Sequence, residues 1–75
     1  MPRVPRVTNA EALRVLNRKG WYQVRQTGSH VHLQSQAHPG TLTVPAHAGA
    51  IIKPGTLKGI IHDAGMTVEE FRQGL

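Results

Sequence analysis

The chain has 75 residues, enough for one small domain that buries only about 60% of the surface its unfolded form exposes. Nine Lys and Arg against four Asp and Glu give a formal net charge of +5, which favours a polyanionic partner such as nucleic acid. The small size excludes a deep pocket dedicated to a small substrate, the absence of cysteine excludes disulfides and zinc–thiolate sites, and the short apolar runs exclude a membrane span.

The first predicted element is a helix that begins after Thr8. Thr8 and Glu11 have the spacing of a capping box, in which each side chain bonds the backbone amide of the other residue. Gly20 is placed to end this helix. Arg14 and Arg18 lie four residues apart on a face separate from the apolar one, so we expect them to contact solvent or phosphate.

Three alternating segments follow, at residues 21–26, 30–34 and 41–44, and predict an antiparallel three-stranded meander. Gly28 and Ser29 form the first turn, the Pro-Gly sequence at 39–40 forms the second, and Pro45 ends the third strand. The Ala-, Gly- and Pro-rich residues 46–55 predict a loop.

A second helix is predicted from about Thr56 to Ala64, and a second capping pattern at Thr67 and Glu70 predicts a short final helix. The order α-β-β-β-α plus a terminal helical turn resembles the double-stranded RNA-binding fold. We therefore expect an α+β domain over residues 1–75, with two helices packed on one face of a three-stranded antiparallel sheet.

Histidine is the residue type here that can serve as acid or base near neutral pH, as cleavage of RNA without a metal requires. His30 follows the Gly28-Ser29 turn, whose small residues let a phosphate backbone approach. His32 is about 6.6 Å further along the same face of the strand and is a secondary candidate, as is His47 after the third strand. From the residues alone, each of these histidines could equally be an ordinary exposed or packing side chain.

Lys53 and Lys58 flank the start of the second helix, where free amides and the positive helix end favour an anion. They could bind phosphate or simply be solvated. A metal held by His30, His32 and His47 would lack a usual fourth ligand, so we expect neither a metal nor another cofactor.

Three stretches in this order resemble the HicA family of toxin ribonucleases: Gly28-Ser29-His30, Val44-Pro45-Ala46-His47 and residues 55–65. The resemblance covers residues 8–71. It implies a bacterial toxin that cleaves mRNA and blocks translation without a metal, with His30 as the catalytic residue. It also implies a cognate HicB antitoxin that covers the basic surface and the histidine.

Composition and resemblance together predict an mRNA endoribonuclease of the cytoplasm, without a membrane partner or small-molecule cofactor. In this hypothesis, His30 is the general acid or base and the RNA-binding residues are Arg14, Arg18, Lys53, Lys58, Gly28 and Ser29. One alternative is a double-stranded-RNA-binding-like module that holds RNA without cutting it. Another is an interaction protein whose basic face binds only a protein.

Overall fold

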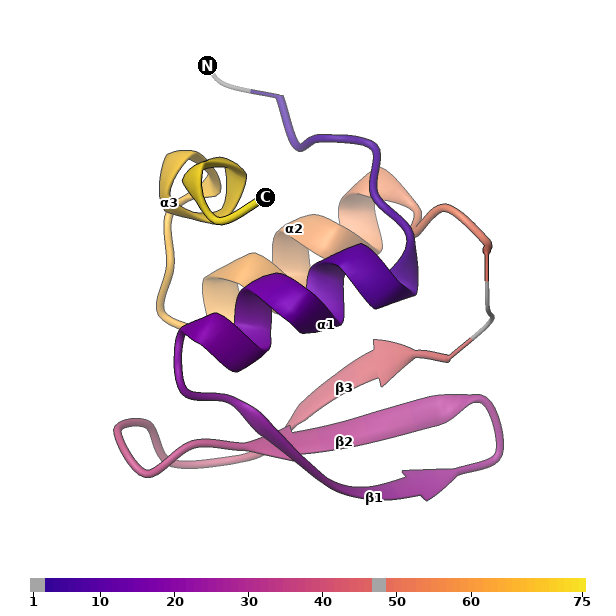
Figure 1. Ribbon diagram of the computed structural model, residues 1–75, viewed down its shortest axis with the longest axis vertical. Helices are drawn as coiled ribbons and strands as arrows, with labels where there is room; N and C mark the ends of the chain where they lie inside the picture. Colours follow the sequence, from indigo (N-terminus) through magenta and orange to yellow (C-terminus); the bar gives the residue numbers. More distant parts are fainter. Residues whose placement is uncertain (1–2, 47–48) are drawn as a thin grey trace.

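The computed structural model describes residues 3–46 and 49–75, and in it two helices cover one face of a three-stranded sheet (Figure 1). The helices are α1 (Asn9–Arg18) and α2 (Pro54–Asp63). The strands are β1 (Tyr22–Thr27), β2 (His30–Gln34) and β3 (Leu42–Pro45). A short helix, α3 (Val68–Gln73), lies on the side of α1 and α2 away from the sheet. The predicted α+β, double-stranded-RNA-binding-like fold is confirmed.

The sheet is an antiparallel meander in the order β1-β2-β3. Thr27 pairs with His30 across a two-residue loop, in which Gly28 has a φ of 56°. In the described chain only glycines have a positive φ, so Ser29 has an ordinary backbone conformation. A positive φ at the first loop residue alone is typical of type II′ turns, whose twist matches that of the flanking strands. The predicted hairpin is therefore confirmed.

The core lies between the inner face of the sheet and the two helices. In β2, Val31 and Leu33 are buried, whereas His30 and Gln34 are exposed. Each helix contributes an apolar stripe to the same cluster, as periodicity predicts. The buried residues of α1 and α2 are Asn9, Ala12, Val15, Leu16, Leu57, Ile60 and Ile61.

Trp21 and His38 pack against each other at one end of the sheet. Trp21, predicted to begin the first strand, precedes β1 instead and is buried in the core. Its ring stacks on that of His38, with centroids 5.7 Å apart. Gly65, whose φ of 74° favours glycine, lies against this ring, and a Cβ there would come within 2.7 Å of His38 Cε1.

The capping boxes predicted for α1 and α3 are both present. In α1, the Thr8 amide donates to Glu11 Oε1 at 2.9 Å and the Glu11 amide donates to Thr8 Oγ1 at 3.2 Å. Thr67 and Glu70 repeat this arrangement in α3 at 2.9 and 3.1 Å. None of the helices in the described chain is long and apolar enough to cross a lipid bilayer.

The second helix begins at Pro54, two residues before the predicted start. Proline is favourable at the first helical position, because its fixed φ suits the helix and its missing N–H would have no partner there. Lys53 is consequently the N-cap residue, and no side chain of the described residues makes a capping hydrogen bond to α2.

Candidate functional site

His30 is the first residue of β2, directly after the Gly28 turn, and its side chain is exposed. It pairs with Pro45 of β3 on its other side, and the Ala46 amide donates to Ser29 O at 2.7 Å. The Gly28-Ser29-His30 and Val44-Pro45-Ala46 stretches are thus neighbours in space. The strand pairing explains why both belong to one site, although His47 lies outside the described residues.

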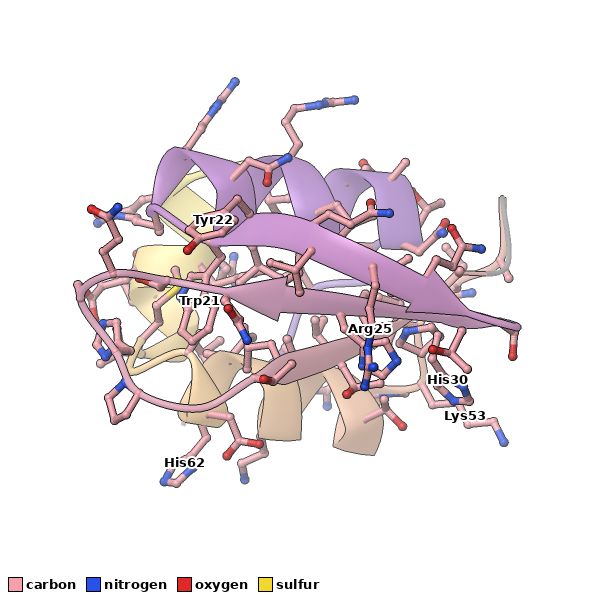
Figure 2. All side chains as sticks on the ribbon, turned by 90° about the horizontal axis from the view of Figure 1, so that it is seen from below. Trp21, Tyr22, Arg25, His30, Lys53 and His62 are labelled. Atoms are coloured by element: carbon pink, nitrogen blue, oxygen red, sulfur yellow. The ribbon has the colours of Figure 1, made fainter. Side chains whose placement is uncertain are left out.

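His30 opens onto a pocket of about 400 Å³ between the sheet and the starts of α1 and α2. Figure 2 shows His30 and Lys53 at the same end of the sheet, opposite Trp21 and Tyr22. The pocket is partly open to solvent. Its described lining residues are Asn9, His30, Pro45, Ala50, Ile51, Ile52, Lys53 and Thr56.

The pocket depends on a backbone contact between residues 7–8 and residues 51–52. Thr8 forms an isolated antiparallel bridge with Ile51, and the Ile52 amide donates to Val7 O at 2.9 Å. These bonds fix the segment that precedes α2 against the segment that precedes α1. Because both helices start immediately after the contact, both helix N-termini border the pocket.

The two N-termini differ in charge. In α1, the Glu11 carboxylate accepts hydrogen bonds from the Thr8 backbone and side chain, which lower its pKa, so it stays ionised at the helix start. In α2, the first turn holds no acid, and Lys53 adds a positive charge at the cap. The amides of Gly55 and Thr56 have no intrahelical acceptor because of their position in the helix. The start of α2 therefore favours an anion.

Asn9 is a pocket residue that the sequence analysis missed. Its side chain is only 8% exposed, and Oδ1 is buried without a hydrogen-bond partner among the described residues. An unsatisfied buried acceptor costs about 1–3 kcal/mol. A signal was present in the sequence: Asn9 follows a Thr8 cap that already completes the capping box, so the helix start does not need a second polar side chain.

His32 does not line the pocket with His30. It faces the open side of the sheet, where its Nδ1 lies 3.4 Å from Thr43 Oγ1, and it is not among the described residues that line the pocket. Among the described residues there is also no group of three or more His, Asp or Glu that could hold a metal ion.

Lys53 alone among the four predicted phosphate-binding cations lines the pocket in the described structure. Lys58 and Arg14 are exposed on their helices, away from its lining. Arg18 Nη1 donates to Gly74 O at 2.9 Å, which ties α1 to the end of α3. Arg6, which the sequence analysis did not select, lines an adjoining groove together with Lys53.

The Gly28-Ser29 turn leaves space beside His30. No other described atom lies within 4 Å of the position that a Cβ would occupy at Gly28. Glycine is therefore required there by its backbone conformation, and the open space leaves room for a ligand.

The chain was compared with known proteins. No curated protein matches it. A family model described as "HicA toxin of bacterial toxin-antitoxin" matches residues 10–66, which is well over half of the chain. The match includes the β1–β2 turn with His30, the end of β3 and the whole of α2. The chain therefore belongs to the HicA toxin family of bacterial toxin–antitoxin systems.

Proposed function

We propose that this toxin is a metal-independent endoribonuclease that cleaves mRNA and thereby blocks translation, with His30 as its general acid or base. The observation that carries the proposal is the position of His30 in one pocket with the uncapped N-terminus of α2 and with Lys53. A titratable group beside an anion-binding helix end suits chemistry on a phosphodiester.

The phosphodiester is held by α2. The free amides of Gly55 and Thr56 and the Lys53 ammonium donate to its oxygens at the positive end of the helix. The same donors stabilise the additional negative charge that develops on phosphorus during the reaction. Arg14 and Lys58, with Gly28 and Ser29, contact neighbouring parts of the RNA strand, whereas the Arg18 guanidinium is held by the Gly74 carbonyl.

Cleavage proceeds by attack of the ribose 2′-oxygen on the adjacent phosphorus. The bond from phosphorus to the 5′-oxygen breaks, leaving a 2′,3′-cyclic phosphate and a 5′-hydroxyl. One proton leaves the 2′-hydroxyl and one reaches the 5′-oxygen, and His30 transfers one of these two protons. Such a positioned group contributes roughly 10²–10⁴-fold to the rate.

The partner that the family implies is an antitoxin, which we propose to be a HicB-like protein with an acidic or complementary surface. A partner lying over the His30 pocket would exclude RNA and neutralise Lys53 together. The toxin would then be inactive until the antitoxin is removed.

Gel analysis of one mRNA transcript incubated in EDTA tests the activity. Wild-type protein should cleave, and His30→Ala should lose at least a hundredfold in rate. His62→Ala is the matched control, because that histidine side chain is 89% exposed on α2 and is not among the described residues that line the pocket. Equal cleavage by His30→Ala and wild type would contradict the catalytic assignment. RNA binding without cleavage by any variant would favour the non-catalytic binding module.

A further inference from the structure

The helices cover one face of the sheet and leave the other face open (Figure 1). Val31 and Leu33 of β2 are buried beneath the helices, so the residues that alternate with them point to the open face. Residues paired across neighbouring strands point to the same face, which extends this assignment to β1 and β3. The open face therefore includes Tyr22, Arg25, His30, His32, Gln34 and Thr43. Apart from His30, the pocket described above contains none of them.

A β-bulge in β1 determines which residues of that strand reach the open face. The pairing with β2 passes from Gln23 directly to Arg25, so Val24 is an extra residue. In a regular strand Tyr22 and Arg25 would point to opposite faces, because side chains alternate along it. The bulge brings both to the open face, and bulges that re-aim a side chain in this way are common next to active sites.

The open face has the chemistry of a nucleic-acid surface. Arg25 is the one charged side chain, histidine aside, in the three strands, whereas all four Asp and Glu of the chain lie in the helices. Tyr22 is 45% exposed, so its ring is accessible to a base. The central row, formed by Arg25, His32 and Thr43, is polar throughout, whereas the centre of a protein interface is mostly apolar. These features favour RNA over a protein as the ligand.

The open face is continuous with the pocket. His30 lines the pocket and, by its register in β2, also belongs to the open face. In Figure 2, which shows the sheet from this side, Arg25 lies between Tyr22 and His30. The distance along β2 from His30 to Gln34, the partner of Tyr22, is about 13 Å at roughly 3.3 Å per residue. Sheets that bind single-stranded RNA by stacking hold about two or three bases.

We propose that the open face of the sheet binds the single-stranded RNA segment next to the cleaved phosphate, with Tyr22 stacked on a base and Arg25 bonded to the backbone. Unpaired bases can stack on an aromatic ring, whereas the bases of a duplex already stack on one another. The sheet thus directs cleavage to unpaired segments of mRNA. This inference rests on the proposed function, since it takes RNA as the substrate and His30 as the point of cleavage.

Fluorescence anisotropy in a His30→Ala background tests the proposal without cleavage. The probes are a fluorescein-labelled 12-mer RNA of mixed sequence and the same 12-mer annealed to its complement. Tyr22→Thr, which removes the ring but keeps a high strand propensity, should weaken single-strand binding about fivefold or more and leave duplex binding unchanged. Tyr22→Phe, which keeps the ring, should bind both probes as the parent does.

A salt titration tests the contact of Arg25 with the RNA backbone. Arg25→Gln should reduce the slope of log affinity against log salt concentration by about 0.7 for the single strand, because one phosphate contact is lost. Arg72→Gln is the charge-matched control, because α3 lies on the side of α1 and α2 away from the sheet. It should keep the slope of the parent.

An unchanged single-strand affinity in Tyr22→Thr, or an unchanged salt slope in Arg25→Gln, overturns the proposal and leaves the open face to a protein partner. Equal loss for both probes in Tyr22→Thr also overturns it, because the ring would then not stack on an unpaired base. Thermal melting establishes that each variant is folded, and Tyr22→Val replaces Tyr22→Thr if threonine does not fit.

The cleavage assay separates this inference from the proposed function. If wild type cleaves RNA while binding is unaffected by Tyr22 and Arg25, the inference alone fails. If wild type does not cleave but single-strand binding depends on Tyr22 and Arg25, the proposed nuclease activity alone fails.

Discussion

The N-termini of α1 and α3 differ from the N-terminus of α2 in the residues at the N-cap and three positions later. In α1 and α3, a threonine at the N-cap and a glutamate three residues later bond each other's amides. In α2 the corresponding residues are Lys53 and Thr56, and no described side chain caps the helix. The two capped ends carry their own anion, whereas the uncapped end, beside His30, leaves that position for a ligand. A helix end can be optimised for stability or for binding. The ends of α1 and α3 are capped, and we propose that the uncapped end of α2 serves binding.

The most severe test transfers the α1 pattern to α2 with the double substitution Lys53→Thr and Thr56→Glu. The new capping box should stabilise the fold by about 0.5–1 kcal/mol. RNA affinity should fall at least tenfold and cleavage should be lost, because the glutamate occupies the phosphate position. Urea denaturation and fluorescence anisotropy measure the two effects on the same samples.

A charge-matched control separates the effect of the α2 site on RNA affinity from the effect of net charge. The double substitution lowers the formal charge from +5 to +3, and Lys19→Glu makes the same change at the end of α1. Lys19→Glu should retain most of the RNA affinity. Equal losses in the two proteins would mean that only overall charge matters, and would contradict an anion site at α2.

The β1–β2 turn provides the next test, because it places His30 at the edge of the pocket. Gly28→Val should destabilise the fold by about 1–2 kcal/mol and lower cleavage per folded molecule, since a β-branched residue disfavours the positive φ. Gly59→Ala inside α2, where no described atom lies within 4 Å of the new Cβ, should stabilise by about 0.5–1 kcal/mol. Cleavage unaffected by Gly28→Val would show that the turn does not position the site.

A single cap removal should affect stability and leave function intact. Thr67→Ala removes the cap of α3 and should cost about 1 kcal/mol, a fall of roughly 4–8 °C in Tm. Cleavage at temperatures where the variant is folded should be unchanged. Lys53→Ala should behave in the opposite way, with a small change in Tm and a clear loss of RNA binding. The same loss of binding in both variants would remove the contrast between the two kinds of helix end.

The smallest expected effect is on acid stability. The pKa values of Glu11 and Glu70 are lowered by hydrogen bonds from Thr8 and Thr67, from an ordinary value of 4.5. Their stabilisation is therefore present above 4.5 and is lost as the pH falls through the lower values of the folded state. Glu70→Gln should give a urea midpoint that depends less on pH below 4.5 than that of wild type. If the urea midpoints of Glu70→Gln and wild type changed equally with pH below 4.5, Glu70 would not be a source of this pH-dependent stability.

Local patterns in the sequence predicted the local structure well. The spacing of Thr8 and Glu11 and the turn at Gly28 depend on neighbouring residues only, and both predictions are confirmed. The predicted start of α2 is two residues late because Pro54 and Gly55 were counted with the Ala-, Gly- and Pro-rich loop, although proline is favourable at the first helical position.

The composition of the site was harder to predict, because it depends on contacts between distant segments. The bridge between Thr8 and Ile51 brings Asn9 and Lys53 to the same pocket, and no periodicity of the sequence indicates that bridge. Arg18 was selected by its charge, yet its guanidinium bonds the Gly74 carbonyl, 56 residues away. Charge in a sequence indicates a candidate, whereas the fold decides which candidates meet.

The most direct test of an RNA site at α2 is a ¹H–¹⁵N NMR titration of the His30→Ala protein with the 12-mer RNA. The largest shifts should occur at the amides of Gly55 and Thr56, which have no intrahelical acceptor, and at those of Asn9 and Lys53 around the same pocket. The capped amides of Glu11 and Glu70 should move little. Shifts concentrated along Arg14 and Arg18 of α1, with Gly55 and Thr56 unchanged, would place RNA elsewhere and contradict the assignment.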